Sequence, residues 1–221
     1  GYFGANLKFS GYDALILEGK SPEPVYISIL NDKVENRPAA HLWGKGATET
    51  EHAIRVEMGP DADRWKKNML SVATIGPAGE NLVRFACIMA DGGRAAGRSG
   101  LGAVMGSKNV KAIAAHGTGE VRIPDPAAFS QAVMAFYQEA RENKELEKRS
   151  MWGTWSLPGR ANKSKTQAAF NFQDGYFEPF TKFEDPAYIR NMLRVRDEGC
   201  FSCPFRCGKR SRISDPDYPW T

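Results

Sequence analysis

The chain has 221 residues, of which 42% are apolar, with 30 Lys and Arg against 26 Asp and Glu and a formal net charge of +4. This apolar content excludes a disordered chain, and no run reaches the roughly 18 apolar residues of a transmembrane helix, so the sequence predicts a soluble globular protein. Four cysteines are too few for a disulfide scaffold, and the mild positive charge does not by itself indicate nucleic acid as a partner.

The two ends of the sequence are unusual for a complete chain. It begins with Gly1-Tyr2-Phe3-Gly4, which lacks an initiator Met and the basic and apolar segments of a signal peptide. It ends with Tyr218-Pro219-Trp220-Thr221, an aromatic finish that is atypical of a frayed terminus. We therefore expect a piece of a longer polypeptide or one subunit of a split protein.

Residues 1–122 have the pattern of an α+β domain, with mixed β-sheets and short helices. A helix is expected to begin at Thr48, with Glu51 reaching back to the Thr48 amide as in a capping box, and with Ile54 and Met58 on one face. Short β-branched and apolar runs, separated by glycine-rich turns, predict strands at residues 14–19, 25–30, 71–75, 83–88 and 110–115.

Residues 123–221 have a helical pattern, and we expect them to begin an all-α domain. Asp125-Pro126 predicts a helix start, because Asp is a good N-cap and Pro is tolerated at the first helical position. The charge run at 141–149 predicts a solvated helix end, and residues 150–183 predict a long irregular stretch of a kind that often carries function. Asp185-Pro186 repeats the start signal, and its helix is expected to run into the cysteines.

A cysteine cluster with the spacing C-x2-C-x3-C is formed by Cys200, Cys203 and Cys207. Loops this short can bring three sulfurs to one metal or cluster, so an iron-sulfur cluster is the favoured interpretation. A zinc site and three unconnected core cysteines stay open as alternatives. The fourth cysteine, Cys87, lies in an apolar run and is interpreted as a small hydrophobe, which leaves the fourth cluster ligand outside this sequence.

The segment around these cysteines is basic. It carries Arg206, Lys209, Arg210 and Arg212 and no acid between residues 200 and 212. Cations beside thiolates lower their pKa and offset the negative charge of a thiolate-bound cluster. Solubility of an exposed surface is the alternative explanation.

A glycine- and arginine-rich loop spans residues 91–108. Glycines let a backbone approach a ligand closely, and the forked donors of Arg94 and Arg98 suit phosphate, so the loop is a candidate anion site. It matches neither the P-loop nor the dinucleotide fingerprint. A tight structural connection with exposed arginines is the alternative.

Several segments, taken together and in order, resemble the tungsten-containing aldehyde ferredoxin oxidoreductase family. These segments are 1–4 (GYFG), 7–14 (LKFSGYDA), 41–45 (HLWGK), 75–83 (IGPAGENLV), 94–98 (RAAGR), 102–109 (GAVMGSKN) and the C-x2-C-x3-C cluster. The resemblance implies that residues 1–122 are the second half of an α+β domain that binds a tungsten bis-pyranopterin. It implies that residues 123–221 begin the helical domain that holds a four-iron four-sulfur cluster.

The resemblance also implies roles for residues of the glycine- and arginine-rich loop. By position, Arg94, Gly97 and Arg98 correspond to contacts with the pterin phosphates. The carbonyl of Ala95 corresponds to a contact with a Mg²⁺ ion that bridges the two pterins. An Asn just upstream of Gly1 would supply the other magnesium contact in the family.

For the cluster, the resemblance implies that Cys200, Cys203 and Cys207 are three of four ligands, the fourth being a cysteine far downstream. The implied reaction is the oxidation of an aldehyde with water to a carboxylic acid. Electrons would leave through the cluster to ferredoxin or another electron-transfer subunit. The implied protein is cytoplasmic and oligomeric, with no nucleic acid partner and no membrane span.

Two rival functions stay open at this stage. A benzoyl-CoA reductase type of catalytic subunit from the same family would keep the same motifs. A non-catalytic iron-sulfur electron-transfer subunit, or a zinc-bound interaction module, would need only the cysteines. His41, His52 and His116 are interpreted as structural or surface residues, because none has a cysteine or carboxylate at ligand spacing.

Overall fold

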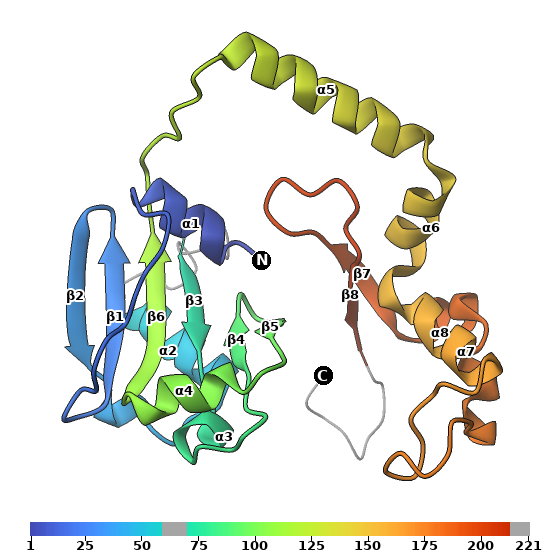
Figure 1. Ribbon diagram of the computed structural model, residues 1–221, viewed down its shortest axis with the longest axis horizontal. Coiled ribbons are helices and arrows are strands. Elements are labelled where there is room, and N and C mark those ends of the chain that lie inside the picture. Colours follow the sequence, from blue (N-terminus) through green and yellow to red (C-terminus); the bar gives the residue numbers. More distant parts are fainter. Residues whose placement is uncertain (59–69, 213–221) are drawn as a thin grey trace. The chain divides into compact units, whose positions relative to one another are not determined.

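One six-stranded mixed sheet organises the first part of the chain in the computed structural model, which describes residues 1–58 and 70–212. The strand order is β2-β1-β6-β3-β4-β5, in which β1 and β6 are parallel and the other neighbouring pairs are antiparallel (Figure 1). The strands are β1 (Val25–Leu30), β2 (Lys33–Pro38), β3 (Ser71–Thr74), β4 (Ile88–Ala90), β5 (Arg94–Ala96) and β6 (Val110–His116).

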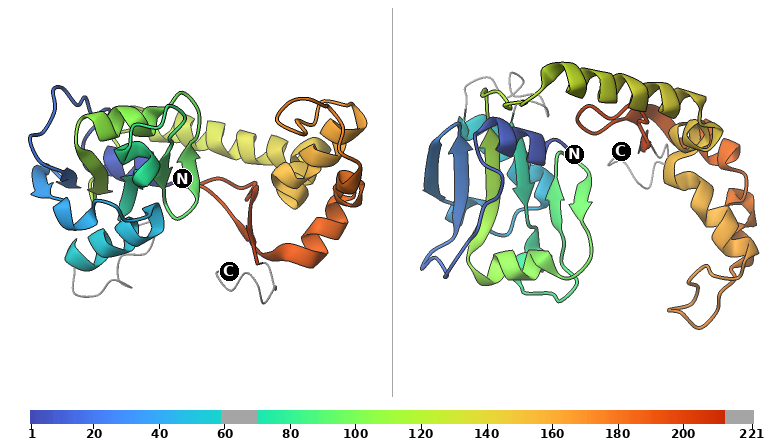
Figure 2. Two further views of the ribbon diagram at one scale, coloured as in Figure 1. Left: turned by 90° about the horizontal axis from the view of Figure 1, so that it is seen from below. Right: turned by 45° about the horizontal axis from the view of Figure 1, so that its top comes forward.

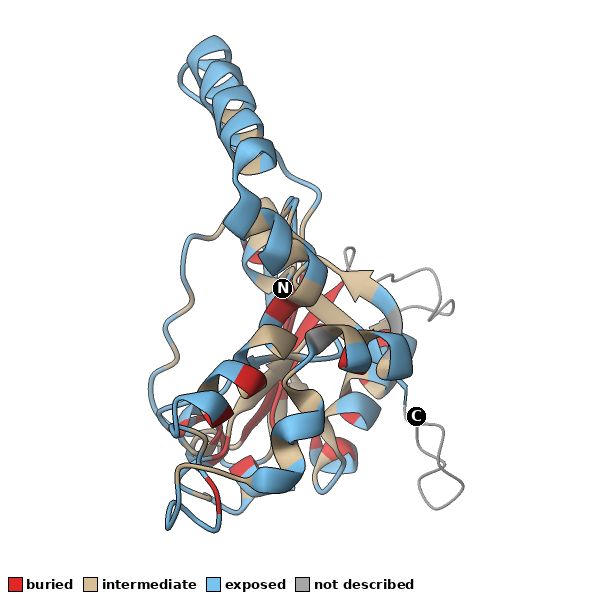
Figure 3. Ribbon diagram, turned by 90° about the vertical axis from the view of Figure 1, so that its right-hand side faces the viewer, coloured by how far each residue is buried: buried red, intermediate tan, exposed pale blue. Residues whose placement is uncertain are grey.

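Both faces of this sheet are covered by helices (Figure 2). α2 (Ala47–Met58) packs on one face, where Ile54 meets Tyr26 of β1. α1 (Phe3–Phe9) and α4 (Leu101–Ser107) pack on the other face, where Leu7 and Met105 meet Ile27. Alternate side chains of β1 therefore enter different cores, as expected for a central strand. The buried residues concentrate on the strands of this sheet (Figure 3).

The strand predictions were confirmed at residues 25–30, 71–75 and 110–115, where β1, β3 and β6 lie, with β6 extending one residue further to His116. The prediction for 14–19 was wrong, because these residues join no strand of the described sheets, although Leu15 and Leu17 pack against the core that contains Ile27. The prediction for 83–88 was also wrong except at its last residue. Its backbone is used in turns, with Val83 N–H donating to the Ala78 carbonyl at 2.9 Å.

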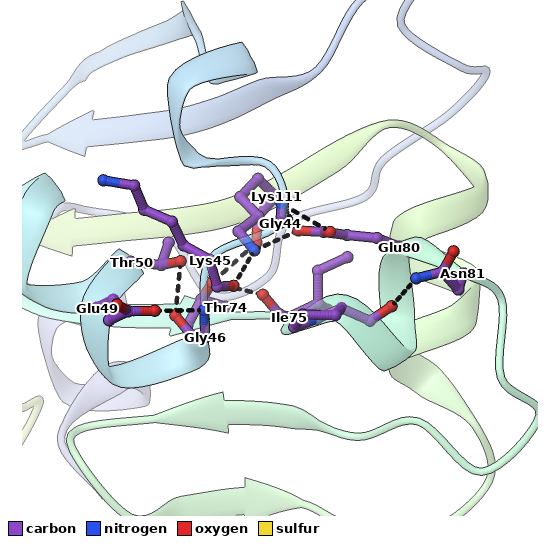
Figure 4. A network of polar contacts seen from close by, with 11 residues as sticks. Gly44, Lys45, Gly46, Glu49, Thr50, Thr74, Ile75, Glu80, Asn81 and Lys111 are labelled. Atoms are coloured by element: carbon purple, nitrogen blue, oxygen red, sulfur yellow. Dashed lines mark hydrogen bonds and ion pairs between the residues drawn. The ribbon is translucent and has the colours of Figure 1, made fainter.

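The start of α2 differs from the predicted capping box. The helix begins at Ala47, and the Gly46 N–H donates to Glu49 Oε2 at 2.9 Å, so Glu49 does the capping expected of Glu51 (Figure 4). Thr50 Oγ1 donates back to the Gly46 carbonyl at 2.9 Å. The capping pair is three residues apart, as expected, but it begins at Gly46 and not at Thr48. The Glu51 carboxylate is therefore available for another contact.

Two short helical elements complete the first part, η1 (Ala40–Leu42) and α3 (Pro77–Glu80).

The chain divides into two compact units, residues 1–122 and residues 123–221. Among the described residues, no helix combines the length and apolar character needed to cross a bilayer. The aromatic segment 218–221 lies outside the described residues.

The second unit is mostly helical. Its elements are α5 (Pro126–Glu142), α6 (Lys144–Trp152), η3 (Gly153–Trp155), α7 (Ser156–Lys163), η4 (Glu178–Phe183), α8 (Pro186–Leu193), β7 (Arg194–Glu198) and β8 (Gly208–Ser211). The predicted cap of α5 was confirmed, since Asp125 Oδ1 accepts a hydrogen bond from the Ala128 N–H at 2.9 Å. The charge run is divided between two helices, because Asn143 ends α5 and caps α6.

Two expectations for this unit need correction. Residues 150–163 and 178–183 are short helices, so the irregular stretch expected at 150–183 is confined to 164–177. The part before the cysteines is not helical, because α8 ends at Leu193 and β7 pairs with β8 in a two-stranded antiparallel sheet. The all-α expectation therefore fails at this hairpin, and the hairpin is where the cysteines lie.

Candidate functional site

A pocket of about 440 Å³ lies in the first unit, beside the hairpin of β4 and β5. Its wall is built from the start of α1, from the strands β3 to β6 and from α4. The lining residues are Gly1, Phe3, Gly4, Ala73, Ile88, Ala90, Asp91, Arg94, Ala95, Ala96, Met105 and Ile113. Most of this wall is apolar, with one acidic and one basic side chain, which is the composition of a small-molecule site.

Arg94 and Ala95, two of the predicted site residues, are brought together in this wall. Both lie in β5, which is at the edge of the sheet and, among the described strands, pairs with β4 alone. The Arg94 side chain has no hydrogen-bond or ion-pair partner within the described residues, so its guanidinium donors are free for a ligand. A free arginine on a pocket wall is well suited to bind a phosphate.

Gly97 and Arg98 follow β5 and lie on an exposed turn beyond the pocket wall. A Cβ atom built on Gly97 would meet nothing within 4 Å, so the backbone is open to the approach of a ligand here. Gly100 is different, because its φ is +68° and a Cβ would lie 2.1 Å from the Arg84 carbonyl oxygen. The glycines of this loop therefore include open ones, Gly93 and Gly97, and at least one, Gly100, that is needed for packing.

Asp91 was not among the predicted site residues. It is 3% exposed, with φ at +51°, and its Oδ2 accepts a hydrogen bond from the Tyr2 N–H at 2.5 Å. Its Oδ1 is buried and has no hydrogen-bond partner in the part of the chain that the structure describes. An unpaired carboxylate oxygen on a pocket wall is a costly feature unless a ligand supplies a donor or a cation. Its position in an Asp-Gly-Gly turn before Arg94 was the available sequence signal.

The three clustered cysteines lie in one loop that joins β7 to β8. All are free and partly buried, and the Cys203 N–H donates to the Cys200 carbonyl at 3.1 Å. Two non-glycine residues of the loop, Ser202 and Arg206, have positive φ values of 50° and 43°. Such backbone conformations are uncommon and indicate a tightly wound loop.

Two helices of the second unit hold this loop. From α5, Tyr137 Oη donates to the Ser202 carbonyl at 3.2 Å, and the Phe136 ring packs edge-on against Phe205 with centroids 6.3 Å apart. From the end of α6, the Ser150 carbonyl accepts a hydrogen bond from Lys209 Nζ at 2.5 Å. The cysteine loop is thus fixed from outside as well as by its own hairpin.

The basic residues near the cysteines are not all free. The Lys209 side chain is 2% exposed and forms an ion pair with Asp197 of β7 at 2.9 Å. Arg210 lies 3.5 Å from Glu198. Arg206 and Arg212 are exposed and remain the candidates to offset negative charge at the loop. Of the four basic residues expected to offset negative charge at the cysteines, two are therefore paired with carboxylates of the described residues and two are not.

The donor set of the loop fits an iron-sulfur cluster in type and spacing, since all three side chains are free thiols separated by two and three residues. Within residues 1–58 and 70–212, no group of three His, Cys, Asp or Glu side chains is arranged to hold a metal ion. The assignment of Cys200, Cys203 and Cys207 as cluster ligands therefore stays a prediction. Cys87 belongs to the first unit, where its Sγ lies 3.6 Å from Met89 Sδ.

Comparison with known proteins identifies the class. Residues 1–117 match the family described as "Aldehyde ferredoxin oxidoreductase, N-terminal domain", and residues 131–220 match "Aldehyde ferredoxin oxidoreductase, domains 2 & 3". The first match alone covers more than half of the chain. This chain belongs to the aldehyde ferredoxin oxidoreductase family.

Particular relatives show how far the likeness extends. The chain is 45% identical to the tungsten-containing aldehyde ferredoxin oxidoreductase of Thermococcus kodakarensis and 43% identical to that of Pyrococcus furiosus, with 96% of this chain covered in each case. It covers 34% of each relative, so it spans about a third of their length. Among solved structures, it matches the active site complex BamBC of benzoyl coenzyme A reductase with a TM-score of 0.70 and 32% identity, covering 97% of this chain and 33% of that one.

Proposed function

We propose that this chain is part of a tungsten-dependent oxidoreductase that oxidises an aldehyde with water to a carboxylic acid. Residues 1–122 would form the second half of its pterin-binding domain, and residues 123–221 would begin its cluster-binding domain. The observation that carries the proposal is the unpartnered Arg94 in a pocket wall, in a chain 45% identical to a tungsten-containing aldehyde enzyme.

The residues present fit the phosphate end of such a cofactor. Arg94 and Arg98 would bind phosphate oxygens, and the open backbone at Gly97 would allow close approach. The Ala95 carbonyl would contact a bridging Mg²⁺ ion, as the resemblance implies. When bound, the tungsten bis-pyranopterin would supply the two-electron oxidation, which also releases two protons. The share of this chain is to hold and orient the cofactor.

The cysteine loop would provide the path by which electrons leave. Cys200, Cys203 and Cys207 would be three of the four ligands of a four-iron four-sulfur cluster. The fourth ligand and the upstream magnesium contact would come from the remainder of the enzyme. A ferredoxin or another electron-transfer subunit would accept the electrons in the cytoplasm, and the enzyme would be an oligomer.

A second candidate function has its own support. The match to the benzoyl coenzyme A reductase complex covers 97% of this chain, so a reductase of that type would use the same pocket and loop. The higher identity to the aldehyde enzymes, 45% against 32%, favours aldehyde oxidation.

Metal analysis of the complete protein tests the proposal. We expect tungsten together with about four irons for each chain. Zinc without tungsten would contradict it and would support an interaction module, and iron without tungsten would support a non-catalytic electron-transfer subunit. Aldehyde-dependent reduction of ferredoxin, compared with turnover of benzoyl-CoA, then separates the two catalytic candidates.

A further inference from the structure

Glu51 of α2 contacts the turn that leads into the pocket strand β5. The Gly92 N–H donates to Glu51 Oε2 at 2.8 Å, although the two residues are 41 positions apart. The other oxygen, Oε1, forms an ion pair with Arg55 Nη2 at 2.7 Å. The Glu51 and Arg55 side chains are only 12% and 10% exposed. Each oxygen of this carboxylate therefore has a separate partner, one on its own helix and one on the turn.

The turn itself is unusual enough to need an external support. Asp91, Gly92 and Gly93 have φ values of +51°, +66° and +151°, so three successive residues have positive φ. Arg94 follows at once and opens β5. A small change in this turn would therefore move the start of β5, where Arg94 and Ala95 line the pocket.

The capping of α2 does not explain Glu51. Glu49 accepts the N–H of Gly46 and serves the helix start. A pair such as Glu51 and Arg55, four residues apart, stabilises a helix only slightly when it is exposed. Here both side chains are largely buried, and the hydrogen bond to Gly92 connects Glu51 to a residue outside α2. A charged acceptor makes a stronger hydrogen bond than a neutral one, and Arg55 fixes its orientation.

We propose that Glu51, oriented by Arg55, is a positioning residue for the cofactor loop. It holds the turn at residues 91–93 so that Arg94 and the Ala95 carbonyl face a phosphate-bearing ligand in the pocket. This inference rests on the proposed function, because the ligand it serves is the pterin cofactor.

The test uses the complete, cofactor-loaded protein and the variants Glu51→Ala, Glu51→Gln and Glu49→Gln. The readouts are pterin and tungsten retained per chain after prolonged gel filtration, and hydrogen exchange at the Gly92 amide. Supporting residues of this kind commonly change affinity by 10–100-fold, so we expect Glu51→Ala to retain about a tenth or less of the wild-type pterin. Glu51→Gln keeps an acceptor but loses the Arg55 ion pair, so it should fall between Glu51→Ala and wild type.

Glu49→Gln is the matched control, since it lies on the same helix but contacts only the helix start. It should retain pterin as wild type does. Faster exchange at Gly92 in Glu51→Gln tests the contact even if Glu51→Ala does not fold. If the wild type holds pterin and both folded Glu51 variants retain it equally, the inference is overturned while the proposed function stands. A wild type without pterin or tungsten would overturn both.

Discussion

Lys111 of β6 and Glu80 of α3 form an ion pair that is almost entirely removed from solvent, with side-chain exposures of 0% and 4% (Figure 4). Lys111 Nζ also donates to the Lys45 carbonyl at 2.8 Å, and the Glu80 carboxylate accepts the Gly44 N–H at 2.8 and 3.0 Å. The pair therefore ties the centre of the sheet to α3 and to the segment before α2. A buried charge pair is tolerated because its remaining donors and acceptors are satisfied in this way.

We expect Lys111→Met to lower the free energy of unfolding by about 3–5 kcal/mol, because it leaves the Glu80 carboxylate buried without its cation. Urea unfolding followed by tryptophan fluorescence measures the change. Lys33→Met is the control, since Lys33 pairs with Glu35 at an exposed site and its loss should change stability little. Equal effects of the two substitutions would show that the buried pair does not stabilise the fold.

The sequence predicted elements well where local pattern and burial agree, and poorly where distant contacts decide. β1, β3 and β6 were found because their apolar runs are central strands of the sheet. The run at 83–88 has equal strand character, but α4 packs against it through Gly102, where a Cβ would lie 2.5 Å from the Cys87 carbonyl oxygen. No short-range pattern reports such a contact.

The same reasoning applies to the candidate site. Arg94 was proposed from its glycine- and arginine-rich segment and Ala95 from the family resemblance, and both lie in the pocket wall. Asp91 and Glu51 could not be predicted, since their roles depend on contacts with Tyr2 and Gly92 that span 89 and 41 residues. The capping-box spacing predicted that Glu51 caps α2. Glu49 does so instead, because it lies at the same spacing from a helix start two residues earlier.

We expect Tyr26 to make the stability of the first unit depend on pH in the alkaline range. Burial raises the pKa of Tyr26 above its ordinary value of 10.0, and the nearby Glu57 carboxylate raises that pKa further, while Arg37 opposes both. Tyr26 Oη also donates to Glu57 Oε2 at 3.2 Å. The unfolded chain therefore loses the tyrosine proton at a lower pH than the folded chain does. The resulting stability is complete below about pH 10 and is lost as pH rises from there toward the folded-state pKa.

Measured unfolding free energies between pH 8 and pH 11 should therefore fall more steeply for wild type than for Tyr26→Phe. Tyr12→Phe is a suitable control, because its hydroxyl also makes one hydrogen bond, to the Asp32 carbonyl at 3.1 Å, at a more exposed site. Parallel curves for wild type and Tyr26→Phe would contradict the assignment.

Gly153 is placed where a side chain would displace a proposed cluster ligand. Its φ is +58°, and a Cβ atom would lie 2.2 Å from the Cys207 carbonyl oxygen. We expect Gly153→Ala to shift Cys207 and to lower the iron content per chain. Gly19→Ala separates this clash from backbone strain, since Gly19 has a similar φ of +70° with nothing within 4 Å. Each should cost about 1 kcal/mol of strain, and only Gly153→Ala should lose iron.

The proposed ligand set predicts opposite outcomes for two cysteines that are both free and partly buried. Cys203→Ser should abolish the broad visible absorbance of the cluster, because it removes a thiolate from the loop between β7 and β8. Cys87→Ala should leave the absorbance unchanged, since the Cys87 thiol lies beside Met89 in the other unit and serves as an apolar contact. Iron content and the absorbance spectrum of the two purified variants decide the matter. Loss of the cluster in Cys87→Ala, with retention in Cys203→Ser, would show that the ligands have been assigned to the wrong cysteines.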